Sequence, residues 1–272
     1  MKKVVLQASI LILLFLGSWF ALRQIEWMNI FEVEKAKDNT QESLGELFLE
    51  TYTQAKNQNF NSQVVEPINS IIDHIAKANA IDREYIKVHI IEKDEVNAFA
   101  LPNGHLIINS GLILNCDNQE EMIGVICHEI AHIELDHVMK KLVKEIGLSV
   151  MISMATGNSG GDVIKESLRV LSSSAFDRSL EKEADLKGVD YLVTAKVDPE
   201  PFAEFLYKIS NTETAATQYF NWVSTHPASK ERATYIIEYH DKGFKDYQSI
   251  LTTETWEKLK EELAKTGNHL DN

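Results

Sequence analysis

The fold is decided by one stretch, DNQEEMIGVICHEIAHIELDHVMKKLVKEIG at residues 117–147, with HEIAH at residues 128–132 near its centre. Apolar residues recur along it at helical spacing and no proline interrupts it, so we expect a long helix between Asp117 and Gly147. Asp117 fits an N-cap, because Glu120 follows three residues later as in a capping box. Gly147 fits a C-terminal stop. The apolar character of the helix predicts that it is buried.

The HEIAH sequence has the pattern of a zinc site. Residues four apart on a helix lie on one face, so His128 and His132 can offer ring nitrogens to a single ion, and zinc accepts neutral imidazoles. Glu129 can lean over the metal without ligating it and take a proton from water there. On a continuous helix His137 would sit about 180° from His128, which makes it a poor ligand. The competing interpretation is a chance match on a surface helix, but burying two histidines and a glutamate has a cost that a functional site would explain.

A third ligand is predicted further along, in SLEKEADLKGVDY at residues 179–191. Glu181 and Asp185 are four apart on the expected helix and share a face. Glu181 can complete the metal site, while Asp185 can accept the free ring N–H of a metal-bound histidine and fix its tautomer. The alternative is a solvated charged face, and Glu183 is the competing ligand. We favour Glu181 because only it pairs with Asp185 at helical spacing.

Upstream of the HEIAH helix, three short runs predict a small antiparallel sheet that leads directly into it: 85–91, 97–101 and 105–109. A Pro102-Asn103-Gly104 turn joins the last two strands. An edge strand there can hold an extended peptide by main-chain hydrogen bonds. Downstream, His226 stands before a proline on a loop. Such a histidine by itself is more often structural, but beside a zinc site it is a reasonable transition-state donor or fourth ligand.

Composition and charge narrow the functional classes. The 272 residues are 44% hydrophobic and 25% charged, which is typical of a globular protein. The formal net charge of −14 disfavours a nucleic-acid partner. The two cysteines are too few for a disulfide scaffold. We interpret Cys127 as a small core residue, and a bridge to Cys116 in an oxidising compartment is the alternative. Nothing in the sequence indicates an oligomeric state.

The N-terminus predicts a membrane anchor. Lys2 and Lys3 precede an apolar run at residues 4–22, and as a helix this run reaches about 28 Å, close to the thickness of a bilayer core. A cleaved signal peptide is the alternative, but bulky Trp19 stands where a small residue should precede Ala21. The two lysines should stay in the cytoplasm, which places the remainder of the chain on the non-cytoplasmic, periplasmic or extracellular, side.

In these motifs the chain resembles the gluzincin peptidases that include the HtpX heat-shock proteases, the CaaX prenyl proteases, the OMA-type mitochondrial protease and the BepA-like periplasmic proteases. The resemblance covers roughly residues 64–239 and rests on four motifs in order. They are Asn97-Ala98-Phe99-Ala100-Leu101-Pro102 with Gly104 and Gly111-Leu112-Ile113; HEIAH with His137; Arg178 followed by Glu181 and Asp185; and His226-Pro227 with Arg232. Each motif alone is weak, but four in this order and spacing are specific.

The resemblance implies a zinc endopeptidase with one Zn²⁺ per chain and protein or peptide substrates. His226 would gate the site or assist at the oxyanion, and Asp185 would orient His128. Carried over residue by residue, the metal ligands are His128, His132 and Glu181, the catalytic residues are Glu129 and His226, the residues behind the ligands are Asp185 and Arg178, and the substrate-binding residues are Asn97, Ala98 and Phe99.

The fold implied is α+β and mainly helical, of the gluzincin type, with an antiparallel sheet beside the HExxH helix and an N-terminal transmembrane helix. We expect the anchor at residues 1–28, a juxtamembrane helix or linker at 29–62, the zinc metallopeptidase domain at 63–245 and a C-terminal helical tail at 246–272. The apolar run at 147–156 is expected to be a core helix or a membrane-facing flap.

One predicted span points to the mostly soluble branch of the resemblance, and so to quality control of misfolded, membrane or envelope proteins. Two alternatives stay open. The first is a membrane-anchored chaperone or binding protein with a latent or structural zinc site, which the glutamate base at Glu129 disfavours. The second is a zinc hydrolase acting on something other than peptides, which the candidate edge strand near Phe99 disfavours.

Overall fold

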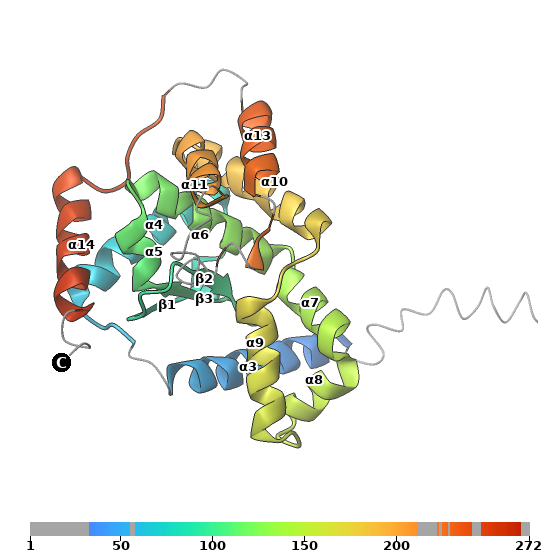
Figure 1. The fold of residues 1–272 in the computed structure, drawn as a ribbon. Helices are drawn as coiled ribbons and strands as arrows, with labels where there is room; N and C mark the ends of the chain where they lie inside the picture. The colour runs from blue at the N-terminus through green and yellow to red at the C-terminus, as the bar shows by residue number, and fades with distance from the viewer. Residues whose placement is uncertain are drawn as a thin grey trace, which may run out of the picture. The chain divides into compact units, whose positions relative to one another are not determined.

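Figure 1 shows the protein as a computed structural model, which describes residues 33–54, 58–210, 222, 225–227, 229–240 and 246–267. The chain divides into two compact units, residues 1–40 and 41–272, and the second holds the sheet, the helices from α4 onward and the candidate site. The elements in order are α3 (Val33–Thr53), α4 (Ser62–Asn79), the 3₁₀ helix η1 (Arg83–Tyr85), β1 (Lys87–Ile91), β2 (Ala98–Ala100), β3 (His105–Asn109), α5 (Ser110–Asn115), α6 (Gln119–Glu134), α7 (His137–Ile146), α8 (Leu148–Ala155), α9 (Gly161–Ser173), α10 (Arg178–Thr194), α11 (Glu200–Ser210), α13 (Ser229–His240) and α14 (Thr253–Gly267).

The long helix predicted at residues 117–147 is two helices, so that expectation was wrong. α6 begins after Asn118, whose side chain accepts from the Glu121 N–H, while Glu121 accepts from the Asp117 N–H. The N-cap therefore lies one residue later than predicted, and Glu121 reaches back to the residue before it. The helix ends because Asp136 adopts a left-handed backbone with φ of 58°, and the side chain of Gln41 donates to its carboxylate at 3.0 Å. This break redirects α7 and changes where His137 points.

The sheet is mixed, not antiparallel as predicted. β2 pairs antiparallel with β3 through the expected turn, but β1 pairs parallel with β3 on its other edge. The segment at residues 92–97 carries the chain across β3, so β3 is central and β2 is an edge strand. In the turn, Asn103 and Gly104 both have positive φ, and a Cβ on Gly104 would lie 1.9 Å from the Tyr85 carbonyl oxygen. Glycine is therefore required there on two grounds.

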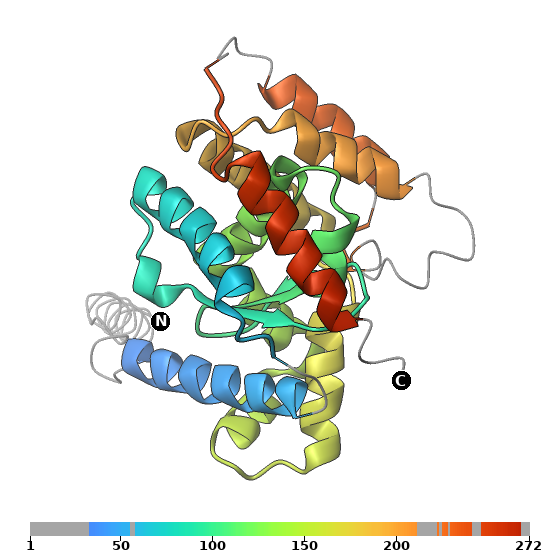
Figure 2. The same cartoon turned by 90° about the vertical axis from the view of Figure 1, so that its left-hand side faces the viewer.

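α6 lies at the centre of this unit. β2 packs on one side of it, and α10 and α11 pack on the other, while α14 covers α4 and α5 at some distance from the site (Figures 1 and 2). Small residues allow the close approach of the helices. A Cβ on Gly188 of α10 would lie 3.2 Å from the His128 backbone nitrogen, and one on Gly124 of α6 would lie 2.4 Å from Phe202 Cβ. The resulting α6–α10 contact brings the two predicted metal motifs together.

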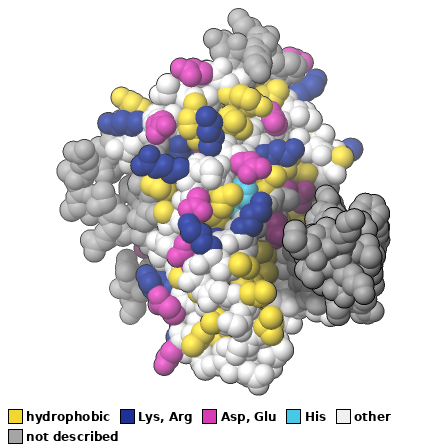
Figure 3. Space-filling view, turned by 90° about the vertical axis from the view of Figure 1, so that its right-hand side faces the viewer, with side chains coloured by type: hydrophobic (Ala, Val, Ile, Leu, Met, Phe, Trp, Pro, Cys, Tyr) yellow, Lys and Arg dark blue, Asp and Glu magenta, His cyan; other side chains and the backbone are white. Residues whose placement is uncertain are grey.

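The apolar run at residues 147–156 forms α8, which is half-buried. Met151 and Met154 are buried, whereas Leu148 and Ile152 are 58% and 49% exposed. Figure 3 shows hydrophobic side chains gathered toward the bottom of one face, over α8 and α9. Among the residues that the structure describes, no helix has the length and apolarity to cross a bilayer. The predicted anchor at residues 4–22 lies outside the described residues.

Both cysteines are free and buried in the described part of the chain. Cys127 is fully buried in the core, in agreement with its interpretation as a small core residue. Burial also raises the pKa of the two thiols.

His74 Nε2 lies 2.9 Å from the Ala195 carbonyl oxygen, which ties α4 to the end of α10.

A histidine pair on the sheet predicts loss of stability in acid. His89 Nε2 lies 2.9 Å from His105 Nδ1, and Gln58 and Glu46 contact the outer nitrogens of the pair. Burial, with the neighbouring charge of Lys87, lowers the pKa of both histidines to about 4. Since these pKa values lie below the ordinary value near 6.5, the unfolded chain binds more protons than the folded chain between about pH 6.5 and 4. Stability should therefore fall as the pH falls through that window.

The measurement is denaturant unfolding of the metal-free protein at about pH 7.5 and about pH 5, for the wild type and a His89→Gln variant. We expect the wild type to lose more stability between the two pH values than the variant. Every other histidine is common to both proteins, so its contribution cancels in the difference. Equal losses would show that His89 does not resist protonation in the fold.

Candidate active site

Four buried side chains converge on one point. His128 and His132 come from consecutive turns of α6, Glu181 from α10, and His226 from the segment before α13. One donor atom of each lies within 4.8 Å of the others. His128 Nε2 is 3.0 Å from His132 Nε2 and 3.7 Å from Glu181 Oε2, while His132 Nε2 is 3.4 Å from Glu181 Oε1. The structure thus brings together the three predicted ligands and the loop histidine.

These spacings fit a metal ion. Tetrahedral coordination with bonds of about 2.0–2.1 Å places ligand atoms roughly 3.3 Å apart, and the spacings among His128, His132 and Glu181 scatter around that value. Imidazole nitrogens with one carboxylate form a donor set that zinc and related divalent ions accept. His226 Nδ1 lies 3.1 Å from His128 Nε2 and 2.9 Å from Glu181 Oε1, so it is placed as a fourth donor.

A buried ion-pair network lies behind the candidate ligands. Asp185 Oδ1 lies 2.9 Å from His128 Nδ1, which leaves Nε2 to face the cluster. Arg232 donates to both oxygens of Asp185, at 2.6 and 2.8 Å, and its Nη1 lies 2.7 Å from Glu181 Oε2. Tyr235 adds a hydroxyl donor to Asp185. One guanidinium therefore contacts both Glu181, a candidate ligand, and Asp185, which lies behind the candidate ligand His128.

The same charges keep both carboxylates ionised. Burial would raise the pKa of Asp185, but Arg232 and His128 lower it to about 2. Burial would likewise raise the pKa of Glu181, but His226 and Arg232 hold it well below its ordinary value. In turn, Glu181 and Glu129 raise the pKa of His226 against the effect of burial. Both carboxylates are thus negatively charged at neutral pH and can attract a cation.

Glu129 lies against the cluster without joining its donor set. Its Oε1 accepts from Trp222 Nε1 and lies 3.2 Å from His226 Nε2, while its Oε2 accepts from the Ala100 N–H at 3.2 Å. Burial would raise its pKa, but His226 above all lowers it to about 2. An ionised carboxylate held beside a metal site can accept a proton from water there.

The edge strand β2 runs past Glu129, and part of its free edge is occupied. The Ala100 N–H points to Glu129. The Val96 carbonyl, just before the strand, accepts from the backbone N–H of Trp222 at 3.3 Å. The Trp222 ring stacks on His226 with 4.5 Å between ring centroids. Glu129 and Trp222 therefore engage main-chain groups with which an extended peptide would pair.

The three predicted substrate-binding residues are buried on or beside this strand. Asn97 Nδ2 donates to Glu95 Oε1 at 3.2 Å, and the Phe99 ring packs edge-on against Tyr52. Ala98 is fully buried. A substrate would therefore meet the main chain of β2 more readily than these side chains, and their role stays a prediction.

Two predicted neighbours of the site lie elsewhere. Arg178 is exposed at the start of α10, where it lines a surface pocket with Glu181, and the guanidinium that contacts Asp185 belongs to Arg232. Glu183, the competing ligand, is 54% exposed and faces His137 Nε2 at 3.4 Å, away from the cluster.

Of the two groups outside the cluster that contact the His132 ring, sequence reasoning named His137, as a poor ligand and as part of a family motif, and missed Phe176. Because α7 turns after Asp136, His137 Nδ1 comes within 3.0 Å of His132 Nδ1, where a continuous helix would have pointed it away. The Phe176 ring stacks on the His132 ring, with 4.1 Å between the ring centroids. Neither Phe176 nor Trp222 stands in a local pattern that would have singled it out.

The chain belongs to peptidase family M48, whose profile matches residues 62–239. Among its relatives, the metalloprotease LoiP of Escherichia coli is 30% identical over 184 residues, which cover 65% of this chain and 70% of LoiP. The mitochondrial metalloendopeptidase OMA1 of Schizosaccharomyces pombe is 25% identical over 195 residues, or 71% of this chain and 58% of that protein. The beta-barrel assembly-enhancing protease of Yersinia pestis is 25% identical over 170 residues, or 58% of this chain and 35% of that protein.

These similarities confirm the family to which the sequence motifs pointed. The matched region spans only about a third of the length of the Yersinia protein and less than two thirds of the Schizosaccharomyces protein. What those whole proteins act on therefore bears on this chain only as a basis for a proposal.

Proposed function

We propose that this protein is a zinc-dependent metalloendopeptidase that cleaves peptide bonds of misfolded, membrane or envelope proteins. The observation that carries the proposal is the buried cluster of His128, His132 and Glu181 with the ionised carboxylate of Glu129 beside it. A purely structural site would not need Glu129, because that residue stands outside the donor set. The names of the relatives, which are proteases, support the same activity.

Each residue of the site has its own role in peptide hydrolysis. When zinc is bound, it supplies Lewis acidity toward the scissile carbonyl and the attacking water. Glu129 accepts the proton of that water and passes it to the leaving amine. His226 serves as a donor to the developing oxyanion or as a further metal ligand. Asp185 and Arg232 hold His128 and Glu181 in place, and the part of the β2 edge that Glu129 and Trp222 do not occupy binds the extended substrate by main-chain hydrogen bonds.

The setting of the activity belongs to the same proposal. The apolar run at residues 4–22 after Lys2 and Lys3 supports a single N-terminal anchor, with the peptidase domain on the non-cytoplasmic side. Quality control of envelope proteins suits that placement, and one relative is named for enhancing the assembly of β-barrels. A cleaved signal peptide would leave the same domain on the same side without the anchor.

The test is to measure bound zinc and casein cleavage together on the full-length protein in detergent. We expect one zinc per chain, and cleavage that is lost on chelation and restored by added zinc, since the ligands are already assembled. Zinc binding without cleavage would favour the alternative function, a membrane-anchored chaperone or binding protein with a latent site. The observation behind this alternative is that the Trp222 ring stacks on His226 of the cluster. A protein that binds no zinc would overturn the site assignment.

A further inference from the structure

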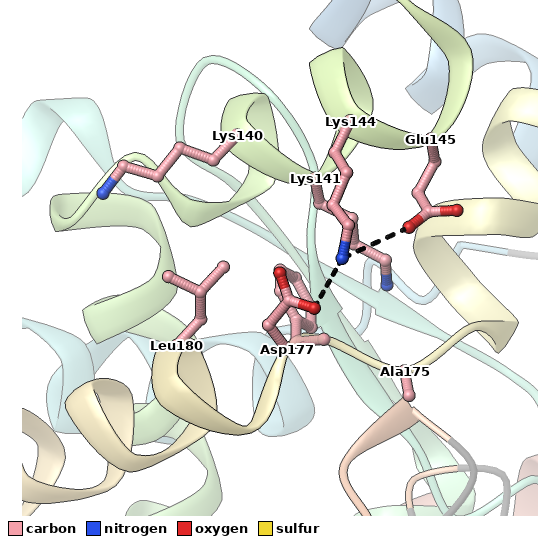
Figure 4. Close-up of a pocket in the computed structure, with 8 residues that line it drawn as sticks. Lys140, Lys141, Lys144, Glu145, Ala175, Asp177 and Leu180 are labelled. Carbon is pink, nitrogen blue, oxygen red and sulfur yellow. Dashed lines mark hydrogen bonds and ion pairs between the residues drawn. The ribbon is translucent and has the colours of Figure 1, made fainter.

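A pocket of about 220 Å³ lies beside the candidate metal cluster, one ring away from it. Three lysines and Glu145 of α7 line one side, and Ala175, Phe176, Asp177 and Leu180 line the other (Figure 4). We call this the lysine pocket. Phe176 is the wall that it shares with the active site: one face of the ring contacts His132, and the ammonium of Lys141 lies 4.0 Å from the ring centroid.

The charge of Lys141 is poorly matched by its surroundings. Lys141 is only 4% exposed. Its ammonium donates to the neutral Ser174 carbonyl, and no carboxylate of a described residue comes within the 4.0 Å ion-pair distance. A buried ammonium without a counterion is unfavourable. Lys144, by contrast, lies between the carboxylates of Asp177 and Glu145, as the dashed lines in Figure 4 show, and Lys140 points away and donates to the Leu135 carbonyl.

The carboxylates of the active site act on the charge of Lys141. Burial lowers the pKa of Lys141 to about 8, whereas the carboxylates of Glu181 and Glu129 raise it. A divalent cation in the cluster would take up the charge of those carboxylates, so Lys141 would be left with still less compensation in the metal-loaded protein. A carboxylate entering the lysine pocket would supply the missing partner through a charge-assisted hydrogen bond.

The size and lining of the pocket suit one side chain. It is smaller than the cavities that hold whole small-molecule ligands, and its apolar lining by Phe176, Ala175 and Leu180 can pack against the methylenes of a glutamate. The Phe176 N–H also donates to the Thr225 carbonyl at 3.2 Å, next to His226. Phe176 therefore connects the lysine pocket directly to the segment that holds His226, and so to the cluster where a substrate would lie.

We propose that the lysine pocket binds an acidic side chain of the peptide substrate close to the scissile bond, with Lys141 as the specificity-determining residue. This inference rests on the proposed peptidase function. It names the substrate class of the same site: proteins cleaved next to an aspartate or a glutamate.

The test uses the full-length, zinc-loaded protein and a set of peptides in which one glutamate is moved through the positions around the scissile bond. Each peptide has a counterpart with glutamine in place of the glutamate, and kcat/KM is measured for both. At one position we expect the glutamate peptide to be preferred roughly 10- to 100-fold, as for a hydrogen bond to a charged group. In Lys141→Met the ratio should fall toward one, and in Lys141→Arg part of it should return.

Lys165→Met is the matched control, because Lys165 is an exposed lysine on α9 away from the pocket and its loss changes the net charge equally. The ratio should be unchanged in this variant. If Lys141 only positions Phe176 against His132, Lys141→Met will lower both rates and keep the ratio, which would overturn the proposal. A wild type that cleaves casein but does not distinguish the paired peptides would overturn it as well, while the peptidase function would stand. A wild type that cleaves neither casein nor peptide would defeat both.

Discussion

Glu129→Gln should abolish peptide cleavage while the protein still binds its metal. The carboxylate is the base of the proposed mechanism, and loss of a positioned acid–base group lowers rates by roughly 10²–10⁴-fold. Metal binding should survive, because Glu129 lies outside the donor set of His128, His132, Glu181 and His226. The measurement is kcat on casein or a fluorogenic peptide, with zinc content determined on the same samples.

The substitution has one structural consequence that needs a control. Both oxygens of Glu129 accept hydrogen bonds, from the Ala100 N–H on one side and from Trp222 Nε1 on the other. A glutamine offers one oxygen and one NH₂, so one of these donors loses its acceptor, which costs about 1–3 kcal/mol. Glu134→Gln, on the exposed side of the same helix, is the matched control for the change in charge. Cleavage that persists in a folded, zinc-loaded Glu129→Gln protein would refute the assignment of the base.

The helical spacing of the candidate ligands was predictable because it depends on local geometry alone. Four residues on a helix is one turn, whatever the helix packs against. His128 and His132, and likewise Glu181 and Asp185, therefore needed no knowledge of tertiary structure. The glycine at position 188 then allows α10 to approach α6 closely enough for the two pairs to meet.

Features set by contacts between distant segments were not predictable. The break at Asp136 depends on a left-handed residue that Gln41, far away in the sequence, contacts. The parallel pairing of β1 depends on a crossover that leaves no mark in strand alternation. Arg232 could be named as part of a motif, but its bridge between Asp185 and Glu181 appears only when α13 and α10 lie side by side.

We expect the third metal ligand to be Glu181 and not Glu183. We expect Glu181→Ala to weaken zinc binding by more than about 100-fold, since the loss of groups that merely support metal ligands already costs 10- to 100-fold. The physical reason is geometric: Glu181 oxygens lie 3.4 Å from His132 Nε2 and 3.7 Å from His128 Nε2, with the carboxylate held by Arg232. The measurement is competition for zinc against a chelator of known affinity.

Glu183→Ala is the matched control, because it removes the same group from the same helix two residues away. Its side chain is half exposed and contacts His137, so zinc affinity should change little. Glu181→Ala also leaves the buried guanidinium of Arg232 with Asp185 as its remaining carboxylate partner, which can lower stability on its own. Glu181→Gln separates the two effects: it keeps the volume and one acceptor oxygen for Arg232, but it removes the charge that the metal requires. If Glu183→Ala loses zinc while Glu181→Gln retains it, then the ligand is Glu183 and the network behind Glu181 serves only the stability of the fold.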